Sequence, residues 1–470
     1  MNGAGHRALI ASRRGGIIPI REQGTSENNV TNQGDIDPGS LQPVTIPRPE
    51  HAISRASISS SALKVLYRLK EAGFQSFLVG GGVRDLLLGR EPKDFDVGTN
   101  ATPDEVRALF RNCRLIGRRF RLAHVRYGRD VIEVATFRAR HDNEEGDGSR
   151  AHSDDGRILR DNVYGSLEDD VWRRDFTVNA LYYDISDFSV VDYVGGLEDL
   201  KTGTLRLIGD PEQRYREDPV RMLRAVRFAA KLGFLIHPDS ETAIHDLGHL
   251  LNDIPPARLF EEIMKLFLGG CAVSTFELLR HYNLFRHLFP MTDEALSHEE
   301  QGFPITFVLR ALENTDLRLA EDKPVTPAFL YAALLWEPAR LRANELLEEG
   351  ASPVEAMQIA GNQLSSEQTQ ATSLPKRFSM PMREIWNLQP RFERKRGKAP
   401  YRLLEHPRFR AAYDFLLLRA EVGEAPAELA RWWTDFQTLN ETERDRMVEP
   451  TPKKRRRRPR RRKPATQTDG

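Results

Sequence analysis

LVGGGVRDLLLGREPKDFDVGTN, residues 78–100, joins an apolar segment, a glycine-rich turn, an Arg-Asp pair and an Asp-x-Asp motif. The apolar residues before the turn predict a strand, and residues 84–88 after it predict a helix. Glycines allow the backbone to approach a ligand closely and to turn its N–H groups toward phosphate, and a helix N-terminus favours anions. We therefore predict a phosphate-binding turn at Gly80 and Gly81.

The Asp-x-Asp motif places Asp94 and Asp96 two residues apart, so on a strand both carboxylates would face the same side. Two adjacent carboxylates repel unless a cation neutralises them, and Mg²⁺ prefers such oxygen ligands. A flexible turn and solvated surface carboxylates are the alternatives for each motif taken alone. Combined, the two motifs outline a nucleotidyl-transfer site with Mg²⁺ as cofactor, or Mn²⁺ in its place.

A third carboxylate is expected because two metals about 3.5–4 Å apart serve nucleotidyl transfer. Glu133 is the best candidate, since it stands alone in the apolar segment 131–137, where an unpaired carboxylate would be costly. The alternative is a glutamate on an edge strand that faces water.

Residues 78–100 resemble the signature of the class II branch of the nucleotidyltransferase superfamily. That branch contains bacterial poly(A) polymerases and the enzymes that add CCA to tRNA. The resemblance implies a third catalytic carboxylate on a strand at the place of Glu133.

Residues 172–184, WRRDFTVNALYYD, form the next motif. Arginine forks suit triphosphate oxygens, and Asp175 can serve as the N-cap of the helical stretch expected to follow. A cap without a catalytic role is the alternative. The run resembles the family's RRDFTxNA motif, which implies nucleotide or metal-site roles for Arg174 and Asp175 and a supporting hydrogen bond from Asn179.

The third motif is REDPVRMLRAVRF, residues 216–228. Asp218 and Arg221 are three apart on one expected helix, so an ordinary ion pair is the alternative interpretation. The motif resembles the EDxxRxxR element with which class II enzymes read the incoming base. It implies that Asp218 and Arg221 contact the base, whereas Arg224 and Arg227 continue toward phosphates or the primer.

Arginines surround Phe120 in residues 117–125, GRRFRLAHV, and basic residues interleaved with an aromatic suit RNA. A solvated strand with a buried Phe is an equal alternative. His124 is interpreted as a packing or hydrogen-bonding residue because no partner histidine is near in sequence.

The predicted site follows from these motifs. Catalysis is assigned to Asp94, Asp96, Glu133 and Asp175, of which the first three bind metal. Nucleotide binding is assigned to Gly80, Gly81, Arg84, Arg174, Asn179, Asp218, Arg221 and Arg224. RNA binding is assigned to Arg118, Arg119, Arg121, Arg227, Lys453, Lys454, Arg455, Arg456, Arg457, Arg458, Arg460, Arg461 and Arg462.

The charge of the chain is strongly asymmetric. Its net charge is +1, but residues 453–463, KKRRRRPRRRK, contain ten basic residues and no acid, so the remainder is acidic. Such a tail suits phosphate-rich partners and gives salt-dependent attraction. An anionic membrane surface or a protein partner is the alternative.

Two cysteines, Cys113 and Cys271, stand far apart and show no metal-binding spacing, which fits a reduced, cytoplasmic setting. The N-terminal apolar residues are interrupted by charge and glycine, so no signal peptide is expected. No run of about 18 apolar residues predicts a membrane span.

The periodicity predicts an α/β head followed by an all-helical remainder. The family resemblance implies that the head is a nucleotidyltransferase domain, a mixed sheet with flanking helices, and that the remainder forms an all-α neck and body. The expected parts are a disordered segment at 1–55, the head at 56–210, a helical neck at 211–275, a helical body with an arginine-rich RNA-binding region at 276–440, and a basic disordered tail at 441–470. Within the head, we expect a capped helix at 59–73, a hairpin at 123–137 and a mobile loop at 141–156. One helix is expected at 217–233.

Residues 110–125, 215–234 and 391–423 resemble bacterial poly(A) polymerases more than CCA-adding enzymes. This resemblance implies template-independent addition of AMP from ATP to RNA 3′ ends, in support of mRNA 3′ processing and RNA decay. The implied partners are RNA 3′ ends, ATP and RNA-decay or RNA-chaperone proteins. The alternatives are CCA addition to tRNA and a non-enzymatic RNA-binding protein.

Overall fold

The computed structural model describes residues 42–117, 121–139, 150–152, 158–161, 163–300, 303–304 and 306–448. The chain divides into two compact units, Met1–Leu288 and Phe289–Gly470. The finer division predicted at residues 210, 275 and 440 stays a prediction. Arg118, Arg119, residues 449–470 of the predicted basic tail and residues 1–41 of the predicted N-terminal segment lie outside the described residues. Residues 441–447, which were predicted to belong to the disordered tail, form the helix α21.

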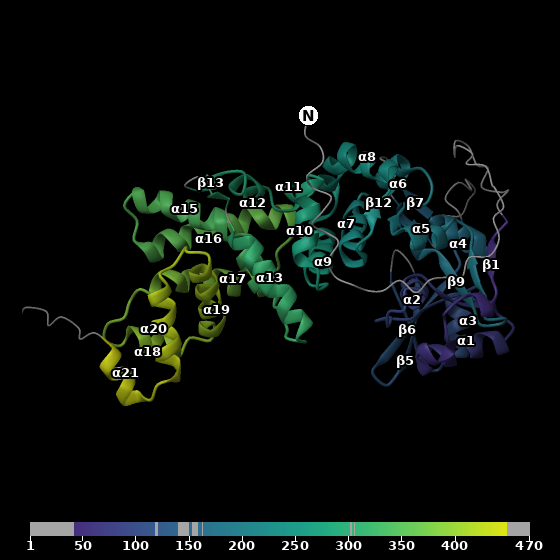
Figure 1. The fold of residues 1–470 in the computed structure, drawn as a ribbon, viewed down its shortest axis with the longest axis horizontal. Coiled ribbons are helices and arrows are strands. Elements are labelled where there is room, and N and C mark those ends of the chain that lie inside the picture. The colour runs from purple at the N-terminus through teal and green to yellow at the C-terminus, as the bar shows by residue number, and fades with distance from the viewer. Residues whose placement is uncertain are drawn as a thin grey trace, which may run out of the picture. The chain divides into compact units, whose positions relative to one another are not determined.

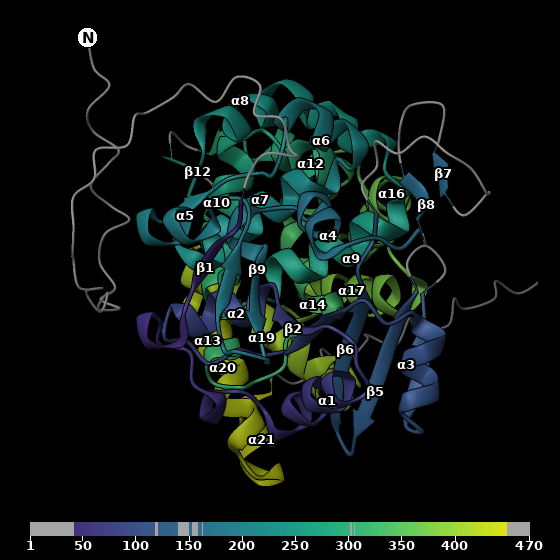
Figure 2. The ribbon, with the colours of Figure 1, turned by 90° about the vertical axis from the view of Figure 1, so that its right-hand side faces the viewer.

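An eight-stranded mixed sheet organises the first unit (Figure 2). Its neighbours pair antiparallel except for β3 and β6, which are parallel. In spatial order the strands are β1 (Val44–Ile46), β10 (Val190–Asp192), β9 (Leu181–Asp184), β2 (Ser76–Val79), β3 (Asp96–Thr99), β6 (Asp130–Thr136), β5 (Leu122–Tyr127) and β4 (Cys113–Ile116). The prediction of a mixed sheet in the head is confirmed.

Strand β1 corrects the predicted N-terminal segment, because residues 44–46 pair with β10 at the edge of the sheet. The short polar stretch around it hid the strand, since three residues are too few to show an alternating pattern. A second difference is the pair β7 (Arg150–His152) and β8 (Ile158–Asp161), of which β7 falls in the predicted loop.

Two local predictions in the head are confirmed. The hairpin of β5 and β6 turns at Gly128, which adopts a positive φ of 62° that glycine tolerates. Helix α1 (Ser60–Glu71) begins after Ser59, whose side chain accepts a hydrogen bond from the Ala62 backbone. Its apolar face buries Val65 and Leu66 against the sheet, and each such side chain contributes roughly 2 kcal/mol.

The other helices of the first unit cover the sheet or follow it toward residue 288 (Figure 1). They are α2 (Gly81–Leu87), α3 (Pro103–Leu109), α4 (Leu167–Arg173), α5 (Gly196–Thr202), α6 (Pro211–Glu217), α7 (Val220–Leu232), α8 (Pro238–Leu247), α9 (Pro256–Phe267), α10 (Ala272–His281) and α11 (Phe285–Leu288). Short 3₁₀ turns are η1 (Arg48–Glu50), η2 (Arg55–Ser57), η3 (Thr177–Asn179) and η4 (Gly248–Asp253). A small parallel pair, β11 (Thr204–Leu205) with β12 (Leu235–Ile236), lies among them and was not predicted.

The predicted helix at 217–233 is divided in the structure. Helix α6 ends at Glu217, Asp218 adopts φ −150°, and α7 begins after Pro219. Proline disfavours helical geometry in the residue before it, which explains the break. Asp218 and Arg221 therefore do not share one helix, contrary to the prediction.

The helical stretch predicted after Asp175 is also shorter than expected. It forms only the single turn η3 and then strand β9. Tyr182 and Tyr183 point to opposite faces of the sheet, into two different apolar clusters, which is the strand period rather than the helical one.

The described part of the second unit is helical apart from the short strands β13 (Glu299–Glu300) and β14 (Phe303–Pro304), in agreement with the predicted all-α remainder. Its helices are α12 (Pro290–Ala295), α13 (Phe307–Ala320), α14 (Pro327–Leu334), α15 (Trp336–Glu348), α16 (Pro353–Thr372), α17 (Lys376–Leu388), α18 (Ala399–Leu404), α19 (Phe409–Glu421), α20 (Ala427–Thr438) and α21 (Glu441–Met447), with the turn η5 (Gln389–Arg391). No helix among the described residues combines the length and apolarity needed to cross a membrane.

Candidate active site

The glycine-rich turn connects β2 to α2 and is lined by two arginines. Gly80 has φ +69°, and a Cβ atom there would lie 3.3 Å from Nη1 of Arg174. A Cβ atom on Gly81 would lie 3.4 Å from Nη2 of Arg84. The backbone of the predicted turn therefore lies close to two guanidinium groups, and a side chain at Gly80 or Gly81 would crowd them.

One row of side chains crosses the sheet next to this turn. Strand pairing places Tyr182 on β9 opposite Val79 on β2, Val79 opposite Asp96 on β3, Asp96 opposite Glu133 on β6, and Glu133 opposite His124 on β5. Directly paired residues share a face, and neighbouring strands are about 4.8 Å apart. The row thus brings two predicted metal ligands, Asp96 and Glu133, side by side.

Asp94 departs from the predicted geometry. Strand β3 begins at Asp96, so Asp94 lies in the exposed loop before it rather than beside it on a strand. The loop packs against α2, where a Cβ atom on Gly82 would lie 3.4 Å from the Asp94 carbonyl oxygen. The carboxylate of Asp94 still acts on Asp96 electrostatically.

Charge repulsion marks this group of carboxylates. Burial, together with the neighbouring carboxylates of Glu133 and Asp94, raises the pKa of Asp96 to about 6, although Arg174 opposes the shift. Glu133 is on an internal strand, so the edge-strand alternative is wrong, and its side chain remains 41% exposed with Oε2 at 3.4 Å from His124 Nε2. In the part of the chain that the structure describes, no three His, Cys, Asp or Glu side chains are arranged to hold a metal ion as they stand.

Asp175 is the centre of a buried hydrogen-bond network instead of a helix cap. Its Oδ2 accepts from Nε and Nη2 of Arg224 at 2.7 and 2.5 Å. Its Oδ1 accepts from Asn179 Nδ2 at 3.2 Å, and Asn179 Oδ1 accepts from Arg84 Nη1 at 2.5 Å. Burial opposes ionisation, but Arg224 and these hydrogen bonds outweigh it and lower the pKa of Asp175 to about 2.

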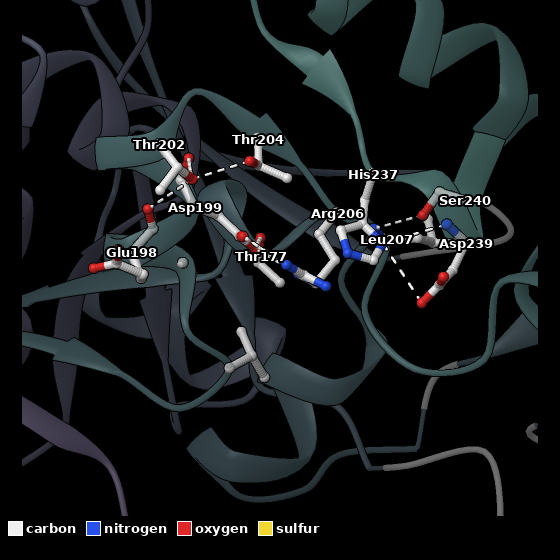
Figure 3. Close-up of polar contacts among 12 residues, drawn as sticks. Thr177, Glu198, Asp199, Thr202, Thr204, Arg206, Leu207, His237, Asp239 and Ser240 are labelled. Atoms are coloured by element: carbon white, nitrogen blue, oxygen red, sulfur yellow. Dashed lines mark hydrogen bonds and ion pairs between the residues drawn. The ribbon is translucent and has the colours of Figure 1, made fainter. Parts of the chain in front are cut away.

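The η3 turn that carries Asn179 is fixed from its other side (Figure 3). Thr177 donates from Oγ1 to Asp199 Oδ2 at 2.7 Å, and Arg206 donates from Nε to the same oxygen at 3.1 Å. The Thr177 carbonyl also lies 2.3 Å from where a Cβ atom on Gly196 would be, so helix α5 can pack this closely only with glycine there. These contacts hold Asn179 in place between Arg84 and Asp175.

The predicted base-reading residues have different partners from those expected. Asp218 Oδ2 accepts from Arg258 Nη2 of α9 at 2.7 Å. Arg221 Nη1 donates to Glu217 Oε2 at 2.9 Å and to the Arg214 carbonyl at 2.6 Å. The simple Asp218–Arg221 ion pair is therefore replaced by two separate pairs.

Arg214 was not predicted, and it joins α6 to the RRD motif. Its Nη2 donates to the carbonyls of Arg173 and Arg174 at 2.9 and 2.7 Å, and its Nη1 donates to Glu217 at 2.7 Å. Burial and the nearby Arg221 lower its pKa to about 10. The sequence could have indicated that Arg214 lies on a helix, since it follows the N-cap Asp210 by four residues. It could not have indicated the carbonyl groups that Arg214 binds, because they belong to a distant segment.

Three guanidinium groups surround the ring of Phe228. The Cζ atoms of Arg84 and Arg224 each lie 5.4 Å from the ring centre, and that of Arg227 lies 4.4 Å away. The buried Nε of Arg227 has no hydrogen-bond partner among the described residues. The structure thus concentrates predicted nucleotide- and RNA-binding arginines around one aromatic ring. Of the predicted RNA-binding arginines outside this group, Arg121 is exposed, with Nη1 at 3.6 Å from Asp104 Oδ2.

Three protein-family models match parts of this chain. Models of the poly A polymerase head domain, of the probable RNA and SrmB-binding site of polymerase A, and of the polymerase A arginine-rich C-terminus match residues 76–206, 233–296 and 349–466. A poly(A) polymerase I of Escherichia coli is 52% identical over 433 residues, which cover 90% of this chain and 93% of that protein. The chain belongs to the bacterial poly(A) polymerase I family.

Other relatives separate this poly(A) polymerase family member from the CCA-adding enzymes. The Haemophilus influenzae poly(A) polymerase I is 47% identical and spans 87% of this chain and 93% of its own length. A CCA-adding enzyme of Lactobacillus helveticus is 40% identical over 217 residues, 46% of this chain and 52% of that enzyme. The crystal structure of the Bacillus stearothermophilus CCA-adding enzyme in complex with CTP aligns with 81% of this chain and 82% of that one, at 27% identity and a TM-score of 0.55. The predicted fold class is confirmed.

Proposed function

We propose that this nucleotidyltransferase transfers AMP from ATP to the 3′-hydroxyl of RNA without a template and releases pyrophosphate. The observation that carries the proposal is the carboxylate pair of Asp96 and Glu133 on parallel strands beside a glycine turn lined by Arg84 and Arg174. The family assignment over nine-tenths of the chain favours poly(A) addition. The sequence of the Lactobacillus helveticus CCA-adding enzyme, by contrast, matches 46% of this chain.

We propose that Asp94, Asp96 and Glu133 hold Mg²⁺, with Mn²⁺ as an alternative. The residues fit such an ion, because all three are carboxylates, and burial together with the charges of Glu133 and Asp94 raises the pKa of Asp96. Bound divalent ions would activate the 3′-hydroxyl and stabilise the pyrophosphate leaving group. Asp94, in its loop, would need to move toward the pair.

The arginines would bind and orient the triphosphate. Arg84 and Arg174 lie beside the backbone of the glycine turn, and their charge complements phosphate oxygens. Asp175 and Asn179 act by holding Arg84 and Arg224, so we assign them positioning roles. Asp218 and Arg221 are proposed to contact the base, from positions fixed by Arg258 and Glu217.

The RNA 3′ end is proposed to approach through Arg118, Arg119, Arg121 and Arg227, with the basic tail adding sequence-independent attraction to phosphate. RNA-decay or RNA-chaperone proteins as partners, a part in mRNA processing, and a cytoplasmic location remain parts of the proposal.

Primer extension tests the reaction. Purified protein, a short single-stranded RNA and Mg²⁺ would be incubated with each of the four nucleoside triphosphates singly. We expect a long ladder with ATP alone. CCA completion on a tRNA that lacks its 3′ end, without a ladder, would assign the tRNA reaction instead. Tight RNA binding without any synthesis would favour the non-enzymatic alternative.

Deletion of residues 453–470 tests the tail. RNA binding should weaken and its logarithmic salt dependence should become shallower, because fewer phosphate counterions are released, while ATP affinity stays nearly unchanged. Fluorescence anisotropy with labelled RNA at several salt concentrations measures this. An unchanged salt slope would remove the tail from the RNA interface.

A further inference from the structure

Arg174 is held from one side by two side chains that no sequence motif assigned a role. Asp170, one turn earlier within α4, accepts from Arg174 Nε at 3.3 Å and from Nη2 at 3.1 Å. Tyr182 on β9 accepts from Arg174 Nε at 2.6 Å. The Tyr182 hydroxyl in turn donates to Asp170 Oδ2 at 2.8 Å, which closes a three-membered ring of hydrogen bonds.

This ring occupies all of one edge of the guanidinium group and leaves the other edge directed at the glycine turn. Nη1 of Arg174 reaches the Asn179 carbonyl only at 3.4 Å and lies where a Cβ atom on Gly80 would be crowded. Its charge also acts on Asp96, which is two strands from Tyr182 in the same cross-strand row. The orientation of Arg174 therefore decides which of its N–H groups meets an anion at the turn.

We propose that Tyr182 and Asp170 are positioning residues for nucleotide binding, because they fix Arg174 so that Nη1 faces a triphosphate at the Gly80 turn. The inference rests on the proposed function, in which ATP occupies that turn. It goes beyond it by assigning two residues, the buried Tyr182 and the partly buried Asp170, that do not themselves touch the substrate.

The arrangement suits this task better than a tyrosine used only for packing. Tyr182 is fully buried, and burial together with Asp170 raises the pKa of its hydroxyl well above the ordinary value, so the group stays a neutral donor. Its ring packs on Phe77 and under the Arg174 guanidinium, with Cζ 5.0 Å from the ring centre. Arginine has many rotamers, and immobilising it before the ligand arrives reduces the entropy lost on binding.

The next residue provides a matched control. Tyr183 is also fully buried on β9, but it faces the opposite side of the sheet, and its hydroxyl has no hydrogen-bond partner among the described residues. Tyr183→Phe removes the same oxygen atom from the same strand without affecting Arg174. Any effect of losing a buried tyrosine hydroxyl in general should appear equally in both variants.

The experiment compares Tyr182→Phe with Tyr183→Phe in the full chain. Steady-state extension gives KM and kcat for ATP and KM for RNA, and equilibrium binding of ATP gives Kd without turnover. For Tyr182→Phe we expect KM and Kd for ATP to rise about tenfold, with kcat and the KM for RNA changed by less than about threefold. Tyr183→Phe should leave all four constants near those of the unaltered chain.

Equal constants in the two variants, or a parallel rise in the KM for RNA, would overturn the inference, since a general loosening of the fold would explain them. If Tyr182→Phe lowers the folded fraction measured by circular dichroism, Asp170→Asn is read instead. It removes the negative charge that pairs with Arg174 and should raise the Kd for ATP relative to the unaltered chain, with the KM for RNA changed by less than about threefold. A stronger effect on RNA than on ATP in Asp170→Asn would contradict the proposal.

Failure of the proposed function is a separate result. If the unaltered chain binds ATP but does not extend RNA, the function is wrong, and the ATP Kd of the two variants still decides whether Tyr182 positions Arg174. If the unaltered chain extends RNA and the two variants bind ATP alike, only the positioning role fails.

Discussion

Each compact unit contains a carboxyl group whose pKa is raised by burial and by a neighbouring carboxylate, Asp96 in the first unit and Glu337 in the second. The two groups differ in their exposure and in the donors around them. In the first unit, burial and the carboxylates of Glu133 and Asp94 raise the pKa of Asp96 to about 6. In the second, burial and the carboxylate of Glu424 raise the pKa of Glu337 to about 7. The first group borders the glycine turn, with Glu133 41% exposed, whereas Glu337 is fully buried.

The carboxylates of Glu337 and Glu424 accept hydrogen bonds from side chains of the same helical unit. Glu337 Oε2 accepts from Arg340 Nε and Nη2 at 3.1 and 2.9 Å. Glu424 Oε2 accepts from Trp336 Nε1 at 2.6 Å and lies 3.7 Å from Arg419 Nε. Among the described residues, Oε1 of Glu337 has no hydrogen-bond partner, and the nearby Glu424 favours the protonated form of Glu337.

The contrast shows that proximity of carboxylates does not by itself indicate a metal site. At Glu337, arginines and one proton balance the charge inside a packed helical unit. At Asp96, the positive charges of Arg174 and His124 offset the negative charge only from a distance. Solvent also reaches the neighbouring Glu133. Access and an unbalanced charge, rather than a raised pKa, favour cation binding at the sheet.

The strongest test of this contrast removes the first group. Asp94→Ala with Asp96→Ala should reduce AMP addition by at least about 10³-fold, because the proposed metal ligands are lost, while RNA binding persists. Primer extension and RNA anisotropy measure the two properties. Glu337→Gln is the control and should retain activity. Synthesis by the double variant would refute the metal assignment.

A second test concerns a carboxylate that is fully balanced by an arginine. Asp175→Asn breaks the pair with Arg224 and should reduce the free energy of unfolding by about 3 kcal/mol at neutral pH. Because the folded pKa of about 2 is below the ordinary value of 3.8, the pair's contribution is complete well above pH 4 and is lost as the pH falls toward 2. Urea unfolding from pH 7 to pH 3 should therefore show the difference from the unaltered chain shrinking. A constant difference would contradict the linkage.

The smallest effect is expected at Glu337. The pKa of Glu337 in the folded chain is about 7, above the ordinary value of 4.5. The free energy of unfolding therefore falls as the pH rises from 4.5 to 7, because the unfolded chain ionises this group more readily than the folded chain does. Glu337→Gln keeps an acceptor for Arg340 and supplies a permanent donor toward Glu424. It should stabilise the chain by about 1–2 kcal/mol at pH 8 and by little at pH 4.5, measured by urea unfolding. Destabilisation at pH 8 would show that the ionised form is preferred.

Sequence reasoning identified the parts of the site that depend on local pattern. The glycine turn, the hairpin of β5 and β6, and the capped helix α1 were predicted because turn residues, alternation and caps act over a few residues. Glu133 was found from the cost of a lone carboxylate in an apolar strand, and the structure places it beside Asp96.

The remaining parts depend on contacts between distant segments. Asp170, Tyr182 and Arg214 owe their importance to partners on other elements, which no spacing reveals. Asp94 was placed on a strand because the motif alone does not show where β3 begins. The helix predicted through Asp218 ignored the backbone preference imposed by Pro219.

Strand β1 has a consequence for how molecules of this chain meet one another. Its three residues cover the outer side of β10, which would otherwise present unpaired N–H and C=O groups as a template for a foreign strand. Val44 is 59% exposed, so β1 is attached mainly through its backbone and contributes little apolar area. A chain shortened to begin after Ile46 is therefore expected to keep its catalytic row but to self-associate along the bare edge of β10. The short strand β1 is thus expected to prevent aggregation of the chain and to have no direct part in catalysis.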